Sequence, residues 1–330
     1  MPERHVVVVA FPGLQPLDAV GPIEVFSGAT QAAEAQGVDG GYRITFASID
    51  GQPVGTRSGI GLCTTVFPDV TEPVDTLLLP GGDGTQDARH DDALLTWVRA
   101  VAPRCRRVAT VCSGAFLGAE AGLLDGRRVA THWARATQLQ TEYPALNVDA
   151  DPIYIRDGKY WSSAGVTAGI DLALALVEDD LGVAVAQTVA RWLVMFLHRP
   201  GGQTQFASPV WVPRAERSAV RAVQSLVEST PAGDHRLPVL AAAAAMSVRH
   251  FARVFAAEVG DTPGHFVERV RLEAARHALE TTDDTLDRIA IACGLGSAES
   301  LRRVFHKHLG VAPDAYRQRF RTTRHERFSA

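Results

Sequence analysis

The chain has 330 residues, of which 46% are hydrophobic and 21% are charged. This length exceeds one ordinary core and predicts two domains, and the composition is that of a globular protein rather than a disordered or fibrous one. No stretch approaches the roughly 20 apolar residues that cross a bilayer, so we expect no membrane association, and the N-terminus lacks a secretory-signal pattern. The cysteines form no CxxC pair, so we expect reduced thiols and a cytoplasmic location; they are Cys63, Cys105, Cys112 and Cys293.

Net charge differs between the two parts of the chain. Residues 200–330 carry 18 Lys and Arg against 14 Asp and Glu, whereas residues 1–199 carry 15 against 23. An acidic N-terminal part joined to a basic C-terminal part indicates that only the second meets a polyanion such as DNA. Chance variation between two ordinary domains remains the alternative at this point.

The first 198 residues alternate between predicted strands and predicted helices. We expect strands at 5–11, 42–49, 75–82, 106–112 and 127–132, a hairpin at 153–163, and helices at 17–29 and 169–182. Strands that alternate with helices form a parallel sheet with helices on both faces. The pattern therefore predicts a doubly wound, flavodoxin-like α/β sandwich whose functional site lies at the carboxyl ends of the strands.

Cys112 stands where the strand at 106–112 passes into the small-residue segment SGA. A thiol at that point faces the N-terminus of the following helix, which favours the thiolate. The backbone N–H groups of Ser113, Gly81 and Gly82 can point at an anion or a polarised carbonyl there. This is the geometry of a nucleophile elbow, with C-S-G-A in place of G-x-S-x-G. Because free cysteines are also often simply buried, Cys112 is either a residue of a ligand site or a small core residue.

Three segments together, FPGLQPLDAVGPIEVF, LLLPGG and VCSGAFLGAEAGLLDGRRVATHW, resemble the ThiJ/PfpI-type domain of the class I glutamine amidotransferase-like superfamily. The resemblance covers roughly residues 5–198 and implies that a carboxylate of the first βα segment orients the cysteine. Asp18 matches that position, and Glu24 is the alternative. Peptidase members place a histidine directly after the nucleophile, where this chain has Ser113, and the His-x-Glu of glutamine-hydrolysing members is missing. We therefore predict no catalytic residue, only a vestigial elbow of Cys112 and Asp18.

The predicted ligand site is built from residues near the strand ends, and it consists of Asp18, Gly81, Gly82, Cys112, Ser113 and His132. His132 enters it only if the fold brings the THW segment close to the elbow. We expect no metal and no cofactor in this site.

Beyond a linker predicted at 199–214, two similar units occupy residues 237–279 and 285–320. Each has a short alanine-rich helix, a turn and a second helix, with the same internal spacing. The second helices begin at the N-cap residues Ser247 and Ser297, and they end at Gly260 and Gly310. Residues 215–330 are therefore predicted to be an all-α domain with two helix-turn-helix motifs.

Helical geometry separates the core face of each second helix from its outer face. Apolar residues at i, i+3 and i+4 must point inward; they are Phe251, Val254 and Phe255 in one helix, and Leu301, Val304 and Phe305 in the other. The outward residues are candidates for contact with bases and phosphates; they are Arg249, His250, Arg253, Ser300, Arg302, Arg303 and Lys307.

The segment GLGSAESLRRVFHKHLGVAPDAYRQRF resembles the signature of the AraC/XylS family of transcription regulators, whose DNA-binding module spans residues 215–320. An amidotransferase-like domain joined to such a module resembles the GlxA-type subgroup. The resemblance implies a sequence-specific regulator of double-stranded DNA, a small nitrogen-containing effector and a homodimer. Two alternatives stay open: a Cys112-dependent hydratase or amidase tethered to DNA, and a redox sensor that uses a low-pKa Cys112.

Overall fold

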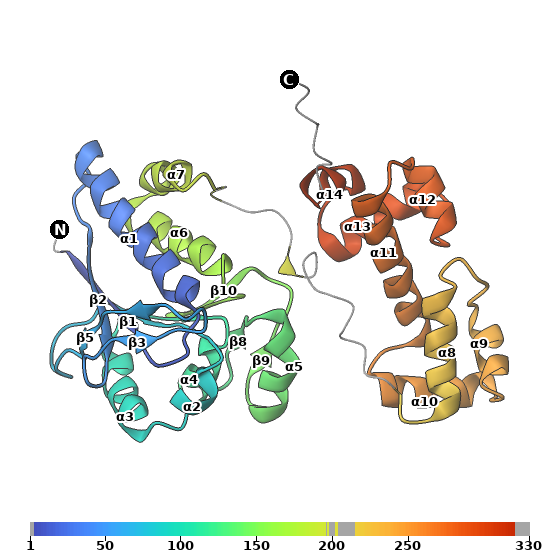
Figure 1. Cartoon of the computed structure of the whole chain (residues 1–330), viewed down its shortest axis with the longest axis horizontal. Helices are drawn as coiled ribbons and strands as arrows, with labels where there is room; N and C mark the ends of the chain where they lie inside the picture. Colours follow the sequence, from blue (N-terminus) through green and yellow to red (C-terminus); the bar gives the residue numbers. More distant parts are fainter. Residues whose placement is uncertain (1–2, 196, 198–201, 204–214, 321–330) are drawn as a thin grey trace. The chain divides into compact units, whose positions relative to one another are not determined.

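A computed structural model describes residues 3–195, 197, 202–203 and 215–320 of the chain (Figure 1). The chain forms two compact units, Met1–Thr204 and Gln205–Ala330. The predicted boundary at 198 and most of the predicted linker at 199–214 lie outside the described residues, so their placement stays a prediction.

The first unit is built on a seven-stranded sheet with the order β10-β11-β7-β6-β1-β2-β5. Its strands are β1 (Arg4–Val9), β2 (Tyr42–Ser48), β5 (Thr65–Val66), β6 (Thr76–Leu79), β7 (Arg107–Val111), β10 (Tyr154–Asp157) and β11 (Tyr160–Ser163). All pairs are parallel except that between β10 and β11, which is antiparallel. This order confirms the doubly wound sandwich and the predicted hairpin.

Helices cover both faces of this sheet (Figure 1). One face carries α1 (Pro16–Gln36), α6 (Ala168–Leu181) and α7 (Val183–Trp192), and the other carries α2 (Thr85–Ala88), α3 (Asp92–Val101) and α4 (Gly114–Glu120). The run Val6–Val9 of β1 has no exposed surface, as expected for a central strand buried on both faces.

The strand predicted at 127–132 is shorter than expected and lies outside the seven-stranded sheet. Only Arg128–Val129 form a strand (β8), and it pairs with β9 (Asn147–Val148) in a separate two-stranded sheet. The hairpin strand β11 already pairs with β7, so that side of β7 is filled. A second small ribbon joins β3 (Val54–Gly55) to β4 (Gly61–Leu62), and α5 (Trp133–Glu142) follows β8.

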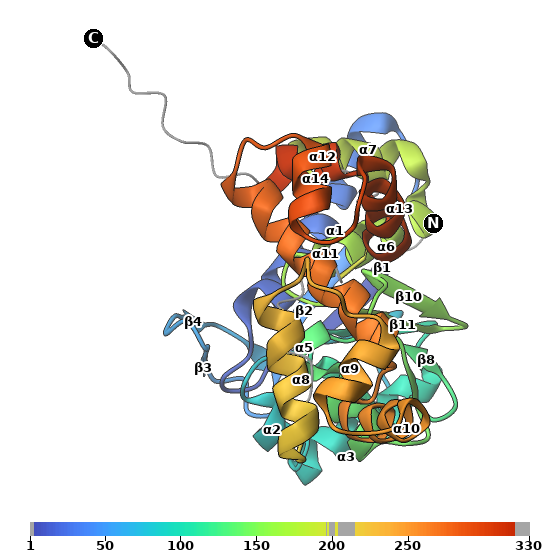
Figure 2. The ribbon, with the colours of Figure 1, turned by 90° about the vertical axis from the view of Figure 1, so that its right-hand side faces the viewer.

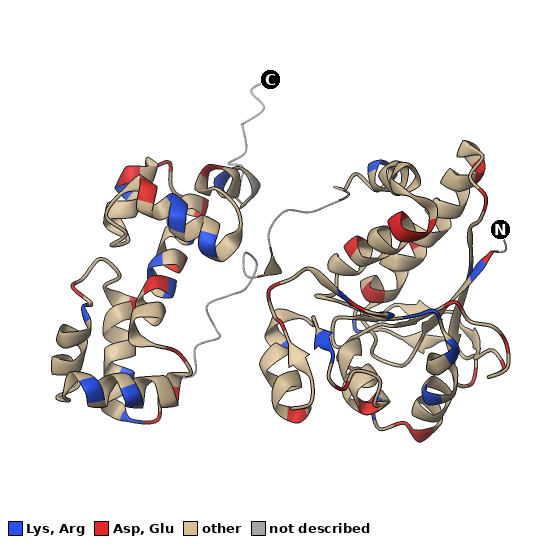
Figure 3. Cartoon of the chain, turned by 180° about the vertical axis from the view of Figure 1, so that it is seen from behind, with Lys and Arg blue, Asp and Glu red and all other residues tan. Residues whose placement is uncertain are grey.

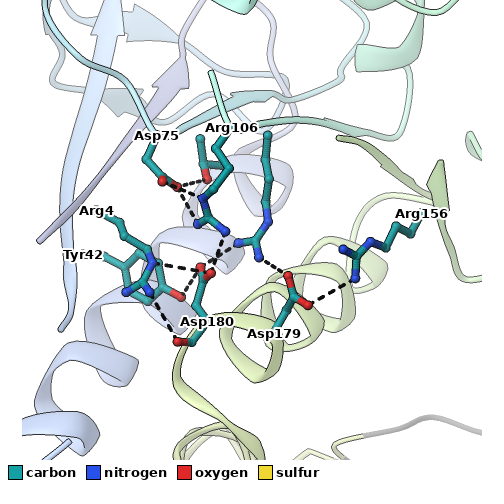
Figure 4. A network of polar contacts seen from close by, with 9 residues as sticks. Arg4, Tyr42, Asp75, Arg106, Arg156, Asp179 and Asp180 are labelled. Carbon is teal, nitrogen blue, oxygen red and sulfur yellow. Dashed lines mark hydrogen bonds and ion pairs between the residues drawn. The ribbon is translucent and has the colours of Figure 1, made fainter. Parts of the chain in front are cut away.

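A network of ion pairs lies near the amino ends of the strands (Figure 4). Its centre is Asp180, which is almost fully buried. The carboxylate of Asp180 accepts from Arg106 Nη1 at 2.9 Å, from Arg107 Nη1 at 2.6 Å and from the Tyr42 hydroxyl at 2.9 Å. Burial alone would raise the pKa of Asp180, but the hydrogen bonds from the two arginines outweigh it and hold that pKa below its usual value. Ion pairs therefore stabilise the amino edge of the sheet. The functional site is expected at the opposite, carboxyl edge.

In the described part of the second unit, residues 215–320, the regular elements are all helices. They are α8 (Ser218–Ser229), α9 (Leu237–Ala243), α10 (Val248–Val259), α11 (Pro263–Thr281), α12 (Leu286–Ala292), α13 (Ala298–Leu309) and α14 (Pro313–Phe320). Figure 2 shows α11 running from the group α8–α10 to the group α12–α14. Phe266 and Val267 of α11 belong to the core of the first group, and Leu272 and Leu279 belong to that of the second. Helix α11, about 28 Å long at 1.5 Å per residue, therefore links two separate cores.

The two predicted helix-turn-helix motifs are α9–α10 and α12–α13. Ser247 and Ser297 accept hydrogen bonds from backbone N–H groups three residues ahead, at 3.4 and 3.2 Å, and Gly260 and Gly310 end the helices with a left-handed φ. These caps confirm the predicted starts and ends. The predicted equal spacing is wrong by one residue, because Gly296 is extra in the second turn.

Within the described parts of the chain, no single helix is long and apolar enough to cross a membrane. The bent pair α9 and α10 reaches that length and hydropathy only when both helices are counted together.

Candidate functional site

Asp18 is the fully buried centre of the site at the carboxyl edge of the sheet. It lies in the first turn of α1. The residue before this helix, Gln15, donates its backbone N–H to Gly81 O at 2.8 Å and so connects the start of α1 to the loop after β6. One carboxylate oxygen accepts from Gly81 N at 3.1 Å and the other from Val166 N at 2.6 Å. Burial raises the pKa of Asp18 to about 6. Glu24, the alternative carboxylate, is exposed farther along the same helix.

Cys112 occupies the predicted elbow, directly after β7. Its φ of 58° lies in the left-handed region, which costs a residue with a side chain of order 1–3 kcal/mol. Its side chain is hydrogen-bonded to Asp18. A strained turn held by a buried partner is the arrangement of a nucleophile elbow.

The surroundings of Cys112 oppose the thiolate expected from its place before a helix. Burial raises the pKa of the thiol, and the neighbouring Asp18 carboxylate raises it further. Helix α4 has only seven residues, and a hydrogen bond from Ser113 lowers the pKa by less than burial raises it. A raised pKa makes a thiol less reactive toward oxidants, which argues against the redox-sensor hypothesis.

The expectation that Gly81 and Gly82 offer open backbone donors is also wrong. Gly81 N donates to Asp18, and Gly82 N donates to the Ser113 hydroxyl at 2.9 Å. A Cβ on Gly81 would lie 2.6 Å from Ser113 N, so this close approach permits only glycine. Because both N–H groups have internal acceptors, neither is free to stabilise a developing oxyanion.

Ser113 is buried and joins two loops. Its hydroxyl contacts Gly82 and also Thr85, with 3.1 Å between the two hydroxyl oxygens. Thr85 was not among the predicted site residues, and neither was Val166. Their only sequence signal is a position just beyond a strand end, which many residues share.

His132 lies beside the site rather than in it. Its Nδ1 caps α5 by accepting from Ala134 N at 3.2 Å, and burial lowers its pKa. The connection to the elbow is made by its neighbour Thr131, whose hydroxyl donates to the carbonyl of Cys112 at 2.7 Å. Sequence reasoning missed Thr131 because this contact depends on the fold.

Helices α10 and α13 carry the residues predicted to contact DNA. The predicted inward residues of both helices are buried, whereas Arg249, Arg253, Arg302, Arg303 and Lys307 are exposed, and His250 and Ser300 are half-buried. Basic positions occur on both helices (Figure 3). Exposed arginines at the start of a recognition helix suit contact with base edges.

Lys307 differs from the other candidates because it contacts an acidic residue on another helix. Its Nζ lies 2.6 Å from Glu268 Oε1 on α11, and His308 contacts the same oxygen. Donor atoms of His265, Glu268 and His308 lie within 4.8 Å of one another, a spacing that could hold a metal ion. The Lys307 ammonium already balances the Glu268 charge, so the cluster acts as a brace between α11 and α13.

Two family models match the chain. The model described as the DJ-1/PfpI family matches residues 4–179, and one described as a helix-turn-helix domain matches residues 240–319. The first contains the Asp18–Cys112 site, and the second contains both motifs described above. The two matches confirm the predicted combination of domains.

Three curated proteins are similar to this chain over much of its length. The HTH-type transcriptional regulator Rv1931c of Mycobacterium tuberculosis is 38% identical over 76% of this chain and 96% of its own length. GlxA of Rhizobium meliloti, also an HTH-type transcriptional regulator, is 27% identical over 84% of this chain and 86% of its own length. An isonitrile hydratase of Pseudomonas putida is 33% identical over 66% of this chain and 89% of its own length.

Two of these relatives are regulators whose similarity extends over both units, and the hydratase shows that a protein with a similar N-terminal domain can be an enzyme. The second unit supplies the two motifs that a regulator needs to bind DNA. The chain therefore belongs to the DJ-1/PfpI family and is a DNA-binding transcription regulator with an AraC-type helix-turn-helix domain.

Proposed function

We propose that the DJ-1/PfpI unit of this regulator binds a small nitrogen-containing metabolite at the Asp18–Cys112 site without transforming it, and that binding changes the affinity for DNA. One observation carries the choice of binding over catalysis. The backbone N–H groups of Gly81 and Gly82, two of the three expected oxyanion donors, are already hydrogen-bonded to Asp18 and Ser113. Burial and the neighbouring Asp18 carboxylate also raise the pKa of the Cys112 thiol, which weakens it as a nucleophile.

The buried carboxylate suggests the chemical class of the effector. Asp18 accepts from Gly81 N, Val166 N and the Cys112 side chain, whereas a carboxylate has about four acceptor positions. A ligand N–H or ammonium group can use the remaining one. Since ionisation of Asp18 is opposed by burial, a cationic ligand would also stabilise the charged form.

The first test is a thermal-shift screen of the full chain with amino acids, amines, betaines and small amides, followed by mass spectrometry of each hit. A stabilising compound recovered unchanged is the expected result, and a hit recovered as product would contradict the proposal. Affinity for an ammonium-bearing hit should rise as the pH rises through about 6, where Asp18 ionises. Asp18→Asn should abolish this pH dependence.

The second candidate function is hydratase or amidase chemistry, which the similarity to an isonitrile hydratase favours. It requires turnover by the full chain that Cys112→Ala abolishes. If Cys112→Ala leaves a ligand-dependent change in DNA binding intact, the cysteine has a structural role only.

For the DNA-bound state, we propose a cytoplasmic homodimer that binds paired half-sites, with the sensor domain at 1–198, the linker at 199–214 and the DNA-binding domain at 215–330. The bases would be read by the exposed arginines of α10 and α13. Sedimentation of the full chain with a duplex selected from a random-sequence library tests this stoichiometry. Two chains per duplex are expected, and one chain per duplex would contradict the dimer.

A further inference from the structure

Gln203 is a polar residue with almost no exposed surface. Its side-chain oxygen accepts from Trp133 N at 2.8 Å, and its side-chain nitrogen donates to Thr131 O at 2.9 Å and to Pro152 O at 3.1 Å. A glutamine amide offers one acceptor oxygen and two donor hydrogens, and here each of them is used. Breaking such a buried set leaves three backbone groups without a partner, which is costly.

The neighbouring backbone is held as closely as the side chain. Gln203 N donates to Asp151 O at 2.6 Å, and a Cβ on Gly202 would lie 2.2 Å from Asp151 Oδ1 and 2.6 Å from Asp151 O. Only glycine fits at 202. Hydrogen bonds and close packing therefore fix the pair Gly202–Gln203, which we call the anchor, against the segment 151–152.

The anchor reaches the candidate ligand site through a single residue. Thr131, which is fully buried, donates its hydroxyl to Cys112 O at 2.7 Å and accepts from Gln203 at its own carbonyl. Trp133 N, another backbone partner of Gln203, belongs to the first residue of α5. The strained elbow and the anchor are thus two hydrogen bonds apart.

The anchor lies near the end of the first unit, so its connection to the ligand site is relevant to the DNA-binding unit. The first compact unit ends at Thr204, one residue beyond Gln203, and the described part of the DNA-binding unit begins at Ala215. In the sequence, the anchor therefore lies between the Asp18–Cys112 site and the helix-turn-helix motifs.

We propose that the Gly202–Gln203 anchor couples the Asp18–Cys112 site to the DNA-binding unit through Thr131. The proposal rests on the proposed sensor function. A ligand that shifts the Cys112 carbonyl changes the hydrogen bond from Thr131, and the Thr131 carbonyl then holds or releases Gln203. The ligand biases the held and released states of the anchor by binding one of them better.

The first measurement tests the anchor itself, by hydrogen–deuterium exchange of the full chain. Gln203→Met has a similar length and lacks the amide, so we expect faster exchange in peptides that cover Trp133 and Gln203, and unchanged exchange in β6. Gln36→Met is the matched control, since Gln36 makes one exposed hydrogen bond to Thr188 at 2.9 Å. Equal exchange at Trp133 in wild type and Gln203→Met would show that the anchor is not formed.

The second measurement tests the coupling, with Asp18→Asn as the perturbation of the site and a duplex selected from a random-sequence library as the DNA probe. DNA affinity is measured for the wild type, Asp18→Asn, Gln203→Met and the double variant. Couplings between sites are commonly 5- to 150-fold. We expect Asp18→Asn to change the affinity at least about 5-fold in the wild type and less than about 2-fold with Gln203→Met.

Each result has a distinct meaning. An equal effect of Asp18→Asn in both backgrounds would overturn the coupling role of the anchor and leave the sensor function standing. No effect in either background would overturn both. If Gln203→Met fails to fold, Thr131→Val replaces it, because valine keeps the shape and removes the hydroxyl; Thr131→Ser, which keeps the hydroxyl, should restore the coupling.

Discussion

The two helix-turn-helix motifs share their geometry and differ in the turn and in how the second helix is braced. In both, an arginine contacts the residue three positions earlier: Arg253 lies 3.3 Å from His250, and Arg303 lies 3.2 Å from Ser300. The ion pairs that brace the two helices have their charges in opposite places. Helix α10 contributes the acidic residue Glu258, which pairs with Arg217, whereas α13 contributes the basic residue Lys307, which pairs with Glu268.

The turns reach the same backbone conformation with different residues. Ala245 has a φ of 54°, and its counterpart Gly294 has a φ of 76°. Ala245 N and Gly294 N both donate to carbonyls three residues back. A duplicated motif therefore keeps its inward residues and caps, while the turn and the outer surface are free to diverge.

Truncating one aromatic residue in each core should have the largest effect. Phe255 and Phe305 are fully buried, and loss of a buried Phe costs about 3–5 kcal/mol. We expect Phe255→Ala to increase hydrogen exchange mainly in α8–α10, and Phe305→Ala mainly in α12–α14. Equal loss of protection in both groups would show that the two cores unfold as one and would break the comparison.

Removal of an exposed arginine should have the second largest effect, a loss of DNA affinity. Arg253→Ala and Arg303→Ala should each weaken binding to a selected duplex by roughly 1–3 kcal/mol if the side chain contacts a base. Fluorescence anisotropy with duplexes mutated in one half of the site checks which motif reads which half. A variant with unchanged affinity would remove that arginine from the DNA-contacting surface.

Exchanging the turn residues should have a smaller effect, with opposite signs in the two motifs. Ala245→Gly should raise the free energy of unfolding by up to about 1 kcal/mol, because glycine adopts positive φ without strain. Gly294→Ala should lower it by at least that much, since the new Cβ would lie 2.7 Å from Pro231 O. Thermal unfolding of the full chain compares them, and a stabilised Gly294→Ala would be the contrary result.

The braces should have the smallest effect on stability. Glu268→Gln should change the free energy of unfolding by less than about 1 kcal/mol, because its ion pair with Lys307 is largely exposed. It should steepen the dependence of DNA affinity on salt by about one unit, as a released Lys307 becomes free for a phosphate. The control Glu258→Gln releases Arg217, which precedes α8, and should leave that slope unchanged. An unchanged slope in Glu268→Gln would mean that Lys307 makes no phosphate contact.

Most of the architecture followed from local patterns. The run of valines at 6–9 and the strand ends near Cys112 and Gly81 predicted the sheet and its functional edge. Serine caps and glycine stops marked both recognition helices, because caps and helical periodicity are decided within a few residues. The strand expected at 127–132 is only two residues long and pairs with β9 outside the main sheet, because strand pairing depends on contacts between remote segments that no local pattern reports.

The sequence by itself determined which residues lie at the strand ends and which face outward from α10 and α13, since both follow from the period of the backbone. Only the tertiary structure decided what those residues do to one another. It gave the backbone donors of Gly81 and Gly82 internal partners, raised the pKa of the Cys112 thiol beside a buried carboxylate, and brought Gln203 to Thr131 across 72 positions of the chain. Hydrogen bonds and pKa values depend on distances of a few ångströms between residues that are remote in sequence, and the packing of the whole unit sets those distances.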